Sequence, residues 1–309
     1  MEISFEGRVA IVTGAGTGLG RAHALGLAAR GARLVINDLG VGTDGRVQSS
    51  DAAHAVAQEI RDLGGEALAH GADVSDAGQV ADMVAATMSQ WGRIDMLVNN
   101  AGILLDKTFA KMTMADFRRV VDVHLIGSAT CTHAVWPIMR EQQYGRVVLT
   151  SSSSGLYGNF GQSNYGAAKA AMVGLMNVLH LEGARDNIRV STLSPTAATR
   201  MTRDLLPPEA AQLLAPESIT PGLLYLVSEN APSRVILCAG AGCYAQTRVY
   251  ETEGVFLEGD ANTPEAVAAQ MGQIGDPAGQ VELKDAFSQT RKYAAKAALA
   301  RRLDLKWGN

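Results

Sequence analysis

Short runs of apolar and β-branched residues alternate along the chain with longer stretches in which apolar residues recur every three or four positions. The short runs predict buried strands, and the longer stretches predict helices that pack one face on a core. The predicted strands are Arg8–Thr13, Arg33–Asn37, Ala67–Ala72, Asp95–Val98, Arg146–Ser151, Ile188–Leu193 and Val235–Ala239. The predicted helices are Leu19–Arg30, Asp51–Leu63, Ala77–Gln90, Met114–Met139 with a break near Pro137, and Tyr165–Arg185.

This alternation predicts the fold class α/β, with a Rossmann-type, doubly wound parallel sheet and helices on both faces. The composition changes after about Tyr250: residues 251–279 are punctuated by Gly, Pro and Asp, and Lys284–Leu303 is a predicted helix. This stretch has too few large apolar residues for its own core. We therefore expect residues 1–250 to form one domain and residues 251–309 to be a C-terminal extension. The extension would pack on that domain or on a neighbouring subunit.

Composition and charge narrow the class of protein. The 309 residues are 47% hydrophobic and 19% charged, with a net charge of -4. No long basic run is present, so we expect no nucleic-acid partner. The three cysteines form no disulfide framework, which fits a reducing compartment. The first residues do not resemble a signal peptide, and no apolar stretch is long enough to span a bilayer, so we expect a cytoplasmic protein without a membrane span or a metal site.

A glycine-rich turn, Thr13-Gly14-Ala15-Gly16-Thr17-Gly18-Leu19-Gly20, follows the first predicted strand and opens the first predicted helix. Glycine lets the backbone turn sharply and approach a ligand closely, and free N–H groups at the start of a helix attract phosphate. An ordinary turn is the alternative, but a strand before and a helix after are the context that a dinucleotide fingerprint requires. The residues expected to contact the cofactor here are Gly14, Thr17, Gly18, Leu19 and Gly20.

Asp38 ends the second predicted strand, twenty residues after Gly18. An acidic residue in this position binds the adenosine ribose hydroxyls of NAD. Its carboxylate would repel the extra phosphate of NADP, and neither Thr17 nor Leu39 supplies an arginine to receive that phosphate. The predicted cofactor is therefore NAD. In the alternative interpretation, Asp38 merely begins a turn.

Two further segments follow predicted strands. Asp73 and Val74 come after the third strand and are candidates for hydrogen bonding to adenine. Asn99-Asn100-Ala101-Gly102 follows the fourth strand, at the carboxyl edge of the sheet, where ligands bind in such folds. A simple turn is the alternative for this second segment. We expect a mixed structural and cofactor-binding role for Asn100, Ala101 and Gly102.

Ser152, Tyr165 and Lys169 have the residue types and spacing of a site for hydride transfer from an alcohol. Tyr165 and Lys169 are four residues apart and therefore share one helix face. The reaction needs a base for the hydroxyl proton, and a neighbouring ammonium lowers the pKa of a phenol from its usual value of about 10. Ser152 can hold the substrate oxygen by a hydrogen bond. An isolated Tyr-x-x-x-Lys pair would usually be a solvated surface feature, but the upstream serine and the cofactor motifs favour catalysis.

Together these motifs resemble the short-chain dehydrogenase/reductase family over about Phe5–Gly242. The resemblance implies that Tyr165 is the general acid/base, that Ser152 stabilises the substrate oxygen, and that Lys169 lowers the tyrosine pKa and binds the cofactor ribose. It also implies a homodimer or homotetramer. Residues 1–250 would then be a dinucleotide-binding and catalytic domain.

Several segments are similar to one branch of that family, the (3R)-hydroxyacyl-CoA dehydrogenase domains of the peroxisomal multifunctional enzymes, which is also known for 17β-hydroxysteroid dehydrogenase activity. These segments are Asn37–Gly40, Asn99–Leu104, Ser154–Gln162 and Arg200–Thr202. Thr263–Val267 is similar to the tail of those domains, which implies that the extension completes the site of a neighbouring subunit.

The sequence departs from the family at two positions. His124 stands where most members have an asparagine that anchors a proton-relay water, and either His124 holds that water or it is a packed helix histidine. Pro195-Thr196 stands where Pro-Gly is usual. The expected nicotinamide contacts are therefore Pro195 and Thr196, with Thr199 as a further candidate.

The segment Arg200–Leu214 is, by family analogy, a mobile lid over an apolar substrate, and a simple packing helix is the alternative. Arg200 and Arg203 are candidates for contacts with the phosphates of coenzyme A.

The predicted function is the NAD-dependent interconversion of a secondary alcohol and a ketone in lipid metabolism, with a (3R)-hydroxyacyl-CoA as the leading small-molecule substrate. One alternative is a dehydrogenase of a free steroid or terpene alcohol. Another is a non-catalytic, dinucleotide-sensing regulator, which the presence of Tyr165 and Lys169 disfavours. Asp38 disfavours an NADPH-dependent acyl-carrier reductase.

Overall fold

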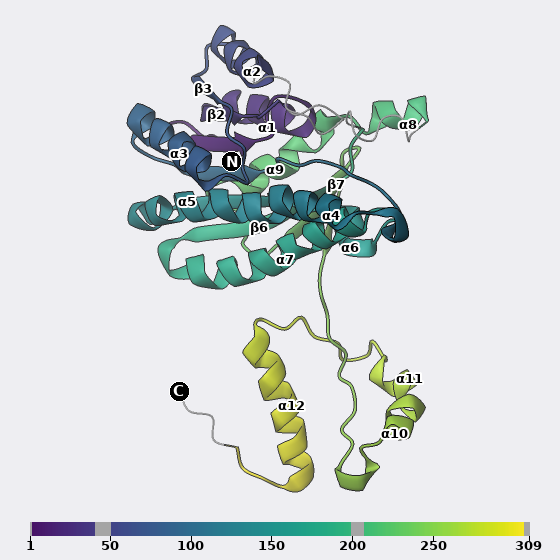
Figure 1. The fold of residues 1–309 in the computed structure, drawn as a ribbon. Coiled ribbons are helices and arrows are strands. Elements are labelled where there is room, and N and C mark those ends of the chain that lie inside the picture. Colours follow the sequence, from purple (N-terminus) through teal and green to yellow (C-terminus); the bar gives the residue numbers. More distant parts are fainter. Residues whose placement is uncertain (1, 41–50, 199–206, 306–309) are drawn as a thin grey trace. The chain divides into compact units, whose positions relative to one another are not determined.

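The computed structural model describes residues 2–40, 51–198 and 207–305 (Figure 1). Residue contacts divide the chain into two units, Met1–Thr247 and Arg248–Asn309. The division falls three residues before the boundary that the sequence suggests at Tyr250.

The first unit is built on an eight-stranded sheet with the order β3-β2-β1-β4-β5-β6-β7-β8. Its strands are β1 Val9–Thr13, β2 Arg33–Asn37, β3 Ala67–His70, β4 Met96–Asn99, β5 Gly145–Thr150, β6 Ile188–Pro195, β7 Ile236–Gly240 and β8 Cys243–Thr247. All neighbouring strands are parallel except β7 and β8, which are antiparallel. The predicted Rossmann-type, doubly wound α/β fold is confirmed.

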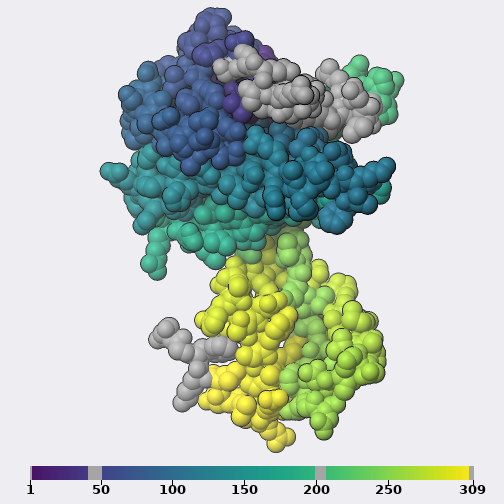
Figure 2. All heavy atoms as spheres, viewed as in Figure 1, coloured from purple at the N-terminus to yellow at the C-terminus, as the bar shows by residue number. Residues whose placement is uncertain are grey.

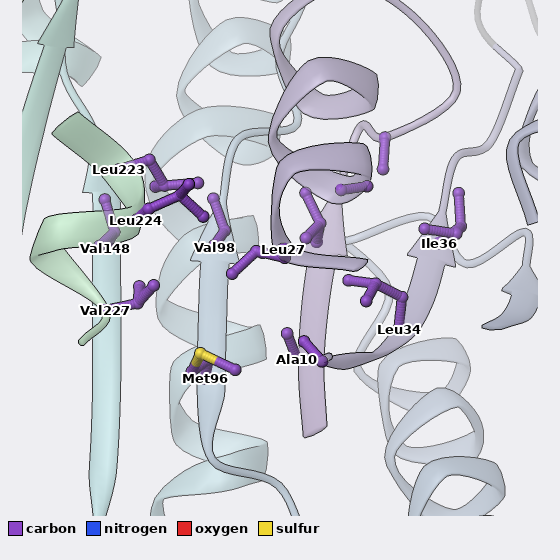
Figure 3. Close-up of a cluster of buried hydrophobic side chains, with 14 of the residues drawn as sticks. Ala10, Leu27, Leu34, Ile36, Met96, Val98, Val148, Leu223, Leu224 and Val227 are labelled. Atoms are coloured by element: carbon purple, nitrogen blue, oxygen red, sulfur yellow. The ribbon is translucent and has the colours of Figure 1, made fainter. Parts of the chain in front are cut away.

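Helices cover both faces of this sheet because successive strand residues point to opposite faces. Ala10 and Val12 join the hydrophobic cluster under α1, α2 and α9, whereas Ile11 between them joins the cluster under α3, α5 and α7. Figure 3 shows the first cluster, in which Leu27 of α1 and Leu223 of α9 lie among strand residues. The helix bounds are α1 Gly18–Ala28, α2 Asp51–Asp62, α3 Ala77–Trp91, α4 Met114–Val121, α5 Gly127–Gln142, α6 Ser153–Tyr157, α7 Ser163–Gly183, α8 Pro208–Leu213 and α9 Thr220–Leu226.

The strand order reverses at β1, which has β2 on one side and β4 on the other. At such a switch point, the loops that leave the carboxyl ends of the strands diverge and open a crevice. Residues from the predicted motifs follow the ends of β1, β2, β4, β5 and β6. They are Gly14, Asp38, Asn100, Ser152 and Thr196. The topology therefore gathers these motifs at one edge of the sheet.

Two local expectations are wrong. The predicted break near Pro137 is absent, since α5 runs through Pro137 to Gln142. Pro137 and His133, whose carbonyl loses its helical N–H donor, are both exposed, so water can satisfy that carbonyl. The irregularity lies earlier, where a π-helical turn, Asp122–Ile126, joins α4 to α5. The antiparallel strand β8 also adds to the predicted seven.

The second unit has little apolar core. Among its described residues, Ala298 is the only buried hydrophobic residue. Its helices are α10 Pro264–Ala269, α11 Met271–Ile274 and α12 Ala286–Arg301. Figure 2 shows α12, in yellow, against the light-green segment that precedes it. Ion pairs join α12 to that segment: Lys292–Glu251, Lys296–Glu253 and Arg301–Glu258. This unit therefore depends on polar contacts more than on apolar burial.

We expect acid to destabilise the first unit through two buried histidines. Burial lowers the pKa of His23 to about 3 and, together with the charge of Lys169, lowers that of His124 to about 3, against 6.5 for the ordinary side chain. Between these values the unfolded chain binds protons that the folded chain does not, so stability falls as the pH drops from 6.5 toward 3. Between pH 7 and pH 5 each histidine should cost about 2 kcal/mol of unfolding free energy.

Urea unfolding at pH 7 and pH 5, followed by tryptophan fluorescence, measures this loss. His23→Gln keeps a polar partner for Thr220, whose hydroxyl lies 3.1 Å from Nδ1 of His23. The variant should lose about 2 kcal/mol less than the wild type between the two pH values. The matched change at an exposed histidine, His133→Gln, should leave the wild-type pH dependence in place. An equal loss in the wild type and His23→Gln would contradict the assignment.

Candidate active site

A cavity of about 430 Å³ opens at the carboxyl edge of the sheet in the first unit. Among the described residues, every cofactor-binding and catalytic candidate from the sequence except Gly20 lines it. From the cofactor motifs these are Gly14, Thr17, Gly18, Leu19, Asp38, Asp73, Val74, Asn100, Ala101, Gly102, Pro195 and Thr196, and from the catalytic motifs His124, Ser152, Tyr165 and Lys169. The structure therefore brings the two groups of motifs into one continuous space.

Gly20, in the first turn of α1, packs against the beginning of the glycine-rich turn. A Cβ atom at Gly20 would lie 2.2 Å from the carbonyl oxygen of Gly14, so only glycine fits there. Asn100 fixes the same turn, because its Nδ2 donates to the carbonyls of Thr13 and Gly14, both at 3.0 Å. Gly20 and the side chain of Asn100 thus shape the turn from the protein side.

The beginning of α1 suits the pyrophosphate of a dinucleotide. Thr17, its N-cap residue, makes no capping hydrogen bond through its side chain, and the first turn holds no acidic residue. The N–H groups at the start of the helix therefore keep their partial positive charge, and Gly18 and Leu19 place that end at the cavity. A negatively charged phosphate group fits this environment.

Asp38 has a structural role in addition to its place at the cavity. Its two carboxylate oxygens accept hydrogen bonds from the backbone N–H groups of Gly16 and Gly40, each at 2.8 Å. A turn at Asp38 is therefore present, as one interpretation expects. Each carboxylate oxygen has a second lone pair, so these bonds leave Asp38 able to accept from ribose hydroxyls as well.

Asp73 is held firmly at the cavity wall. Its carboxylate accepts hydrogen bonds from the backbone and hydroxyl of Ser75 and pairs with Arg119 at 3.3 Å. Burial raises the pKa of Asp73, but these hydrogen bonds and the Arg119 charge outweigh it and leave the pKa below its ordinary value. Asp73 is therefore ionised near neutral pH, with its partners already in place.

Ser152, Tyr165 and Lys169 come together from two helices. Ser152 is the N-cap residue of α6 and accepts from the backbone N–H of Ser154 at 3.2 Å. Tyr165 lies in the first turn of α7, and Lys169 follows one turn later. The Lys169 ammonium is buried, donates to the carbonyl of Thr150 at 2.6 Å and lies 5.7 Å from the centre of the Tyr165 ring. Because an ammonium can donate three hydrogen bonds, Lys169 can also bind hydroxyls in the cavity.

The pKa of Tyr165 differs from the sequence expectation. Burial raises it above its ordinary value, the hydrogen bond from Ser152 lowers it, and the charge of Asp106 raises it further. Burial also lowers the pKa of Lys169 to about 7, so its ammonium is partly neutral near pH 7. The net effect of the chain's own groups is therefore to raise the tyrosine pKa, since burial outweighs the hydrogen bond from Ser152.

His124 lies in the π-helical turn, edge-on to Tyr165 with ring centres 5.2 Å apart. Its Nε2 is 3.0 Å from the N–H and 2.8 Å from the carbonyl of Ile103, and the ring tautomer decides which bond forms. Nδ1 is buried without a hydrogen-bond partner among the described residues. The buried His124 ring thus has one nitrogen bonded to Ile103 and the other without a partner among the described residues. This arrangement is compatible with both sequence interpretations.

Other cavity residues were not assigned a role from the sequence. They include Ile103, Leu104, Arg119, Asn159 and Gln162. Gln162 could have been found, because it precedes Tyr165 by one helical turn. Arg119 carries no such signal. Thr199, Arg200, Arg203 and the first part of the predicted lid lie outside the described residues, so the choice between a lid and a packing helix stays open.

Comparisons with known proteins identify the family. A model of the short chain dehydrogenase family matches residues 8–210. The peroxisomal hydratase-dehydrogenase-epimerase of Saccharomyces cerevisiae is 44% identical over 277 residues, which is 89% of this chain and 31% of that enzyme. The chain thus spans about a third of the length of this relative.

Solved structures agree with this assignment. The full-length peroxisomal multifunctional enzyme type 2 of Drosophila melanogaster superposes with a TM-score of 0.79 and 36% identity, over 97% of this chain and 50% of that one. A 7α-hydroxysteroid dehydrogenase complexed with NADH and 7-oxo glycochenodeoxycholic acid gives a TM-score of 0.70 and 30% identity, over 77% of this chain and 95% of that one. The chain therefore belongs to the short-chain dehydrogenase family and is an oxidoreductase that acts on CH–OH groups.

Proposed function

We propose that this chain is an NAD-dependent dehydrogenase that interconverts a (3R)-hydroxyacyl-CoA and the corresponding 3-ketoacyl-CoA. The observation that carries the proposal is the single cavity, which has Asp38 and the start of α1 along one part and Ser152, Tyr165 and Lys169 along another. A dinucleotide and an alcohol bound in one cavity can be in direct contact, so a hydride can pass between them without crossing solvent.

On the cofactor side, the start of α1 would hold the pyrophosphate, Asp38 the adenosine ribose, and Asp73 and Val74 the adenine. Asn100, Ala101, Gly102, Pro195 and Thr196 would border the nicotinamide half, and Lys169 its ribose. NAD bound there would supply the acceptor for the hydride that leaves the carbinol carbon. The carboxylate of Asp38 favours NAD over NADP, because it would repel a phosphate on the adenosine ribose.

On the substrate side, Tyr165 takes the hydroxyl proton as the carbon–hydrogen bond breaks, and it returns that proton in the reverse direction. Ser152 hydrogen-bonds the substrate oxygen and the phenol, so it stabilises the charge that develops between them. The positive charge of the oxidised nicotinamide would favour ionisation of Tyr165 and so oppose the effect of burial. His124, with its open Nδ1, is proposed to hold the water through which the proton leaves.

The names of the relatives support the substrate class. A hydratase adds water across a carbon–carbon double bond and produces an alcohol, and a dehydrogenase in the same chain can oxidise that alcohol. The yeast relative is named for a hydratase, a dehydrogenase and an epimerase, and this chain matches 31% of it. The steroid-bound relative keeps a free hydroxysteroid as a second candidate. A homodimer or homotetramer and a cytoplasmic location stay predictions. No helix among the described residues is long and apolar enough to cross a membrane.

The test is reduction of NAD by the purified full chain with (3R)-hydroxybutyryl-CoA, its 3S isomer and a free hydroxysteroid, followed at equal enzyme concentrations. We expect kcat/KM for the 3R thioester to exceed that for either other substrate by at least about tenfold. Turnover of the steroid alone would replace the thioester by the second candidate. NAD binding without turnover of any of the three would contradict the proposed function.

A further inference from the structure

A polar network outside the catalytic trio holds the side chain of Gln162 at the cavity. Its Nε2 donates to the carboxylate of Asp106 at 2.6 Å. Its Oε1 accepts from the hydroxyl of Ser154 at 2.8 Å and from Nδ2 of Asn159 at 3.0 Å. Because a carboxylate only accepts hydrogen bonds, the NH₂ group of Gln162 must face Asp106, and the orientation of the amide is fixed.

The network is continuous with the catalytic residues. The backbone N–H of Ser154 donates to the hydroxyl of Ser152, and Gln162, the N-cap residue of α7, precedes Tyr165 by three residues, about 4.5 Å along the helix axis. The amide therefore lies near the point at which the alcohol reacts.

One N–H group of the Gln162 amide is left without a hydrogen-bond acceptor among the described residues. Its oxygen has two donors, and one of its two N–H groups is bound to Asp106. The second N–H has no acceptor among the described residues, and Gln162 lines the cavity. A ligand with an acceptor near its reacting hydroxyl would satisfy this group, whereas a hydrocarbon there would leave it unpaired.

We propose that Gln162, oriented by Asp106, donates a hydrogen bond to the thioester carbonyl of a 3-hydroxyacyl substrate and so selects for it. In such a substrate the carbonyl carbon is two bonds from the carbon that is oxidised. The carbonyl oxygen is therefore always close to the reacting hydroxyl. An isolated secondary alcohol has no acceptor at that distance. This inference rests on the proposed function and identifies a residue that recognises the substrate of that reaction.

The test compares (3R)-hydroxybutyryl-CoA with the matching thioether, in which a methylene replaces the carbonyl. Gln162→Met keeps the length of the side chain and removes its donors. It should lower kcat/KM for the thioester about fivefold to tenfold and leave that for the thioether unchanged, as expected for one neutral hydrogen bond. An equal effect on both substrates, or on neither, would overturn the inference.

Two further variants sharpen the result. Gln58→Met is the matched control, since Gln58 also donates its amide to a carboxylate, Asp62 at 2.7 Å, on the exposed face of α2. It should behave as the wild type. Asp106→Asn removes the carboxylate that orients Gln162 and should reduce the preference for the thioester by about threefold, which tests the idea even if Gln162→Met does not fold. An unchanged preference in this variant would count against the role of Asp106.

The two failures are distinguishable. A wild-type chain that oxidises the thioether or a steroid but not the thioester would refute the proposed function itself. A wild-type chain that oxidises the thioester, with a preference that Gln162→Met does not alter, would refute only the role of Gln162.

Discussion

Replacing Tyr165 with phenylalanine should lower kcat for alcohol oxidation about a thousandfold while NAD binding stays close to that of the wild type. The phenol is the titratable group beside Ser152 in the cavity that can take the hydroxyl proton directly, and a positioned acid/base contributes 10² to 10⁴ in rate. The ring itself would remain, edge-on to His124 with the wild-type separation of 5.2 Å between ring centres. Packing should therefore change little.

The matched control is Tyr157→Phe. Tyr157 is exposed, its hydroxyl lies 2.8 Å from that of Thr247, and it does not line the cavity. Steady-state kinetics gives kcat, NAD titration by fluorescence gives the affinity, and a thermal melt shows whether each variant is folded. If folded Tyr165→Phe kept more than a tenth of the wild-type rate, another group would have to be the base.

The parts of the site that the sequence predicts are local. Gly14, Asp38, Asn100 and Ser152 each follow a strand within one or two residues, so an apolar run and the polar residue after it are enough to find them. Parallel strands then carry these positions to the same edge of the sheet. Tyr165 and Lys169 are similarly local, because their spacing of four fixes a shared helix face.

The parts that the sequence misses depend on contacts between distant segments. Gln162 and Asp106 are 56 residues apart, and neither carries a local signal that they pair. The raised pKa of Tyr165 follows from burial, which no motif discloses. Strand β8 escapes detection because four of its five residues are exposed, so its sequence lacks the alternation that marks a half-buried strand. Tertiary packing decides each of these features.

Asp38→Asn should reduce the preference for NAD over NADP about a hundredfold, measured as the ratio of the two kcat/KM values. Hydrogen bonds from ribose hydroxyls to a charged acceptor are worth about 1.5–3 kcal/mol, and the variant exchanges that acceptor for a neutral one. It also removes the charge that would repel the phosphate of NADP. Most of the change should appear in KM, because the proposed contact of Asp38 is with the adenosine ribose and not with the reacting half of the cofactor.

The control for this variant must allow for the structural role of Asp38, whose carboxylate accepts hydrogen bonds from the backbone N–H groups of Gly16 and Gly40. Asp76→Asn makes the same change at a carboxylate that also accepts two backbone N–H groups, those of Gly78 and Gln79, but does not line the cavity. It should leave the cofactor preference unchanged. If Asp38→Asn weakened NAD and NADP equally, Asp38 would act only by shaping the glycine-rich turn. A rise in the KM for NAD together with a fall in the KM for NADP requires a carboxylate that faces the ribose, because loosening the turn would weaken both cofactors alike.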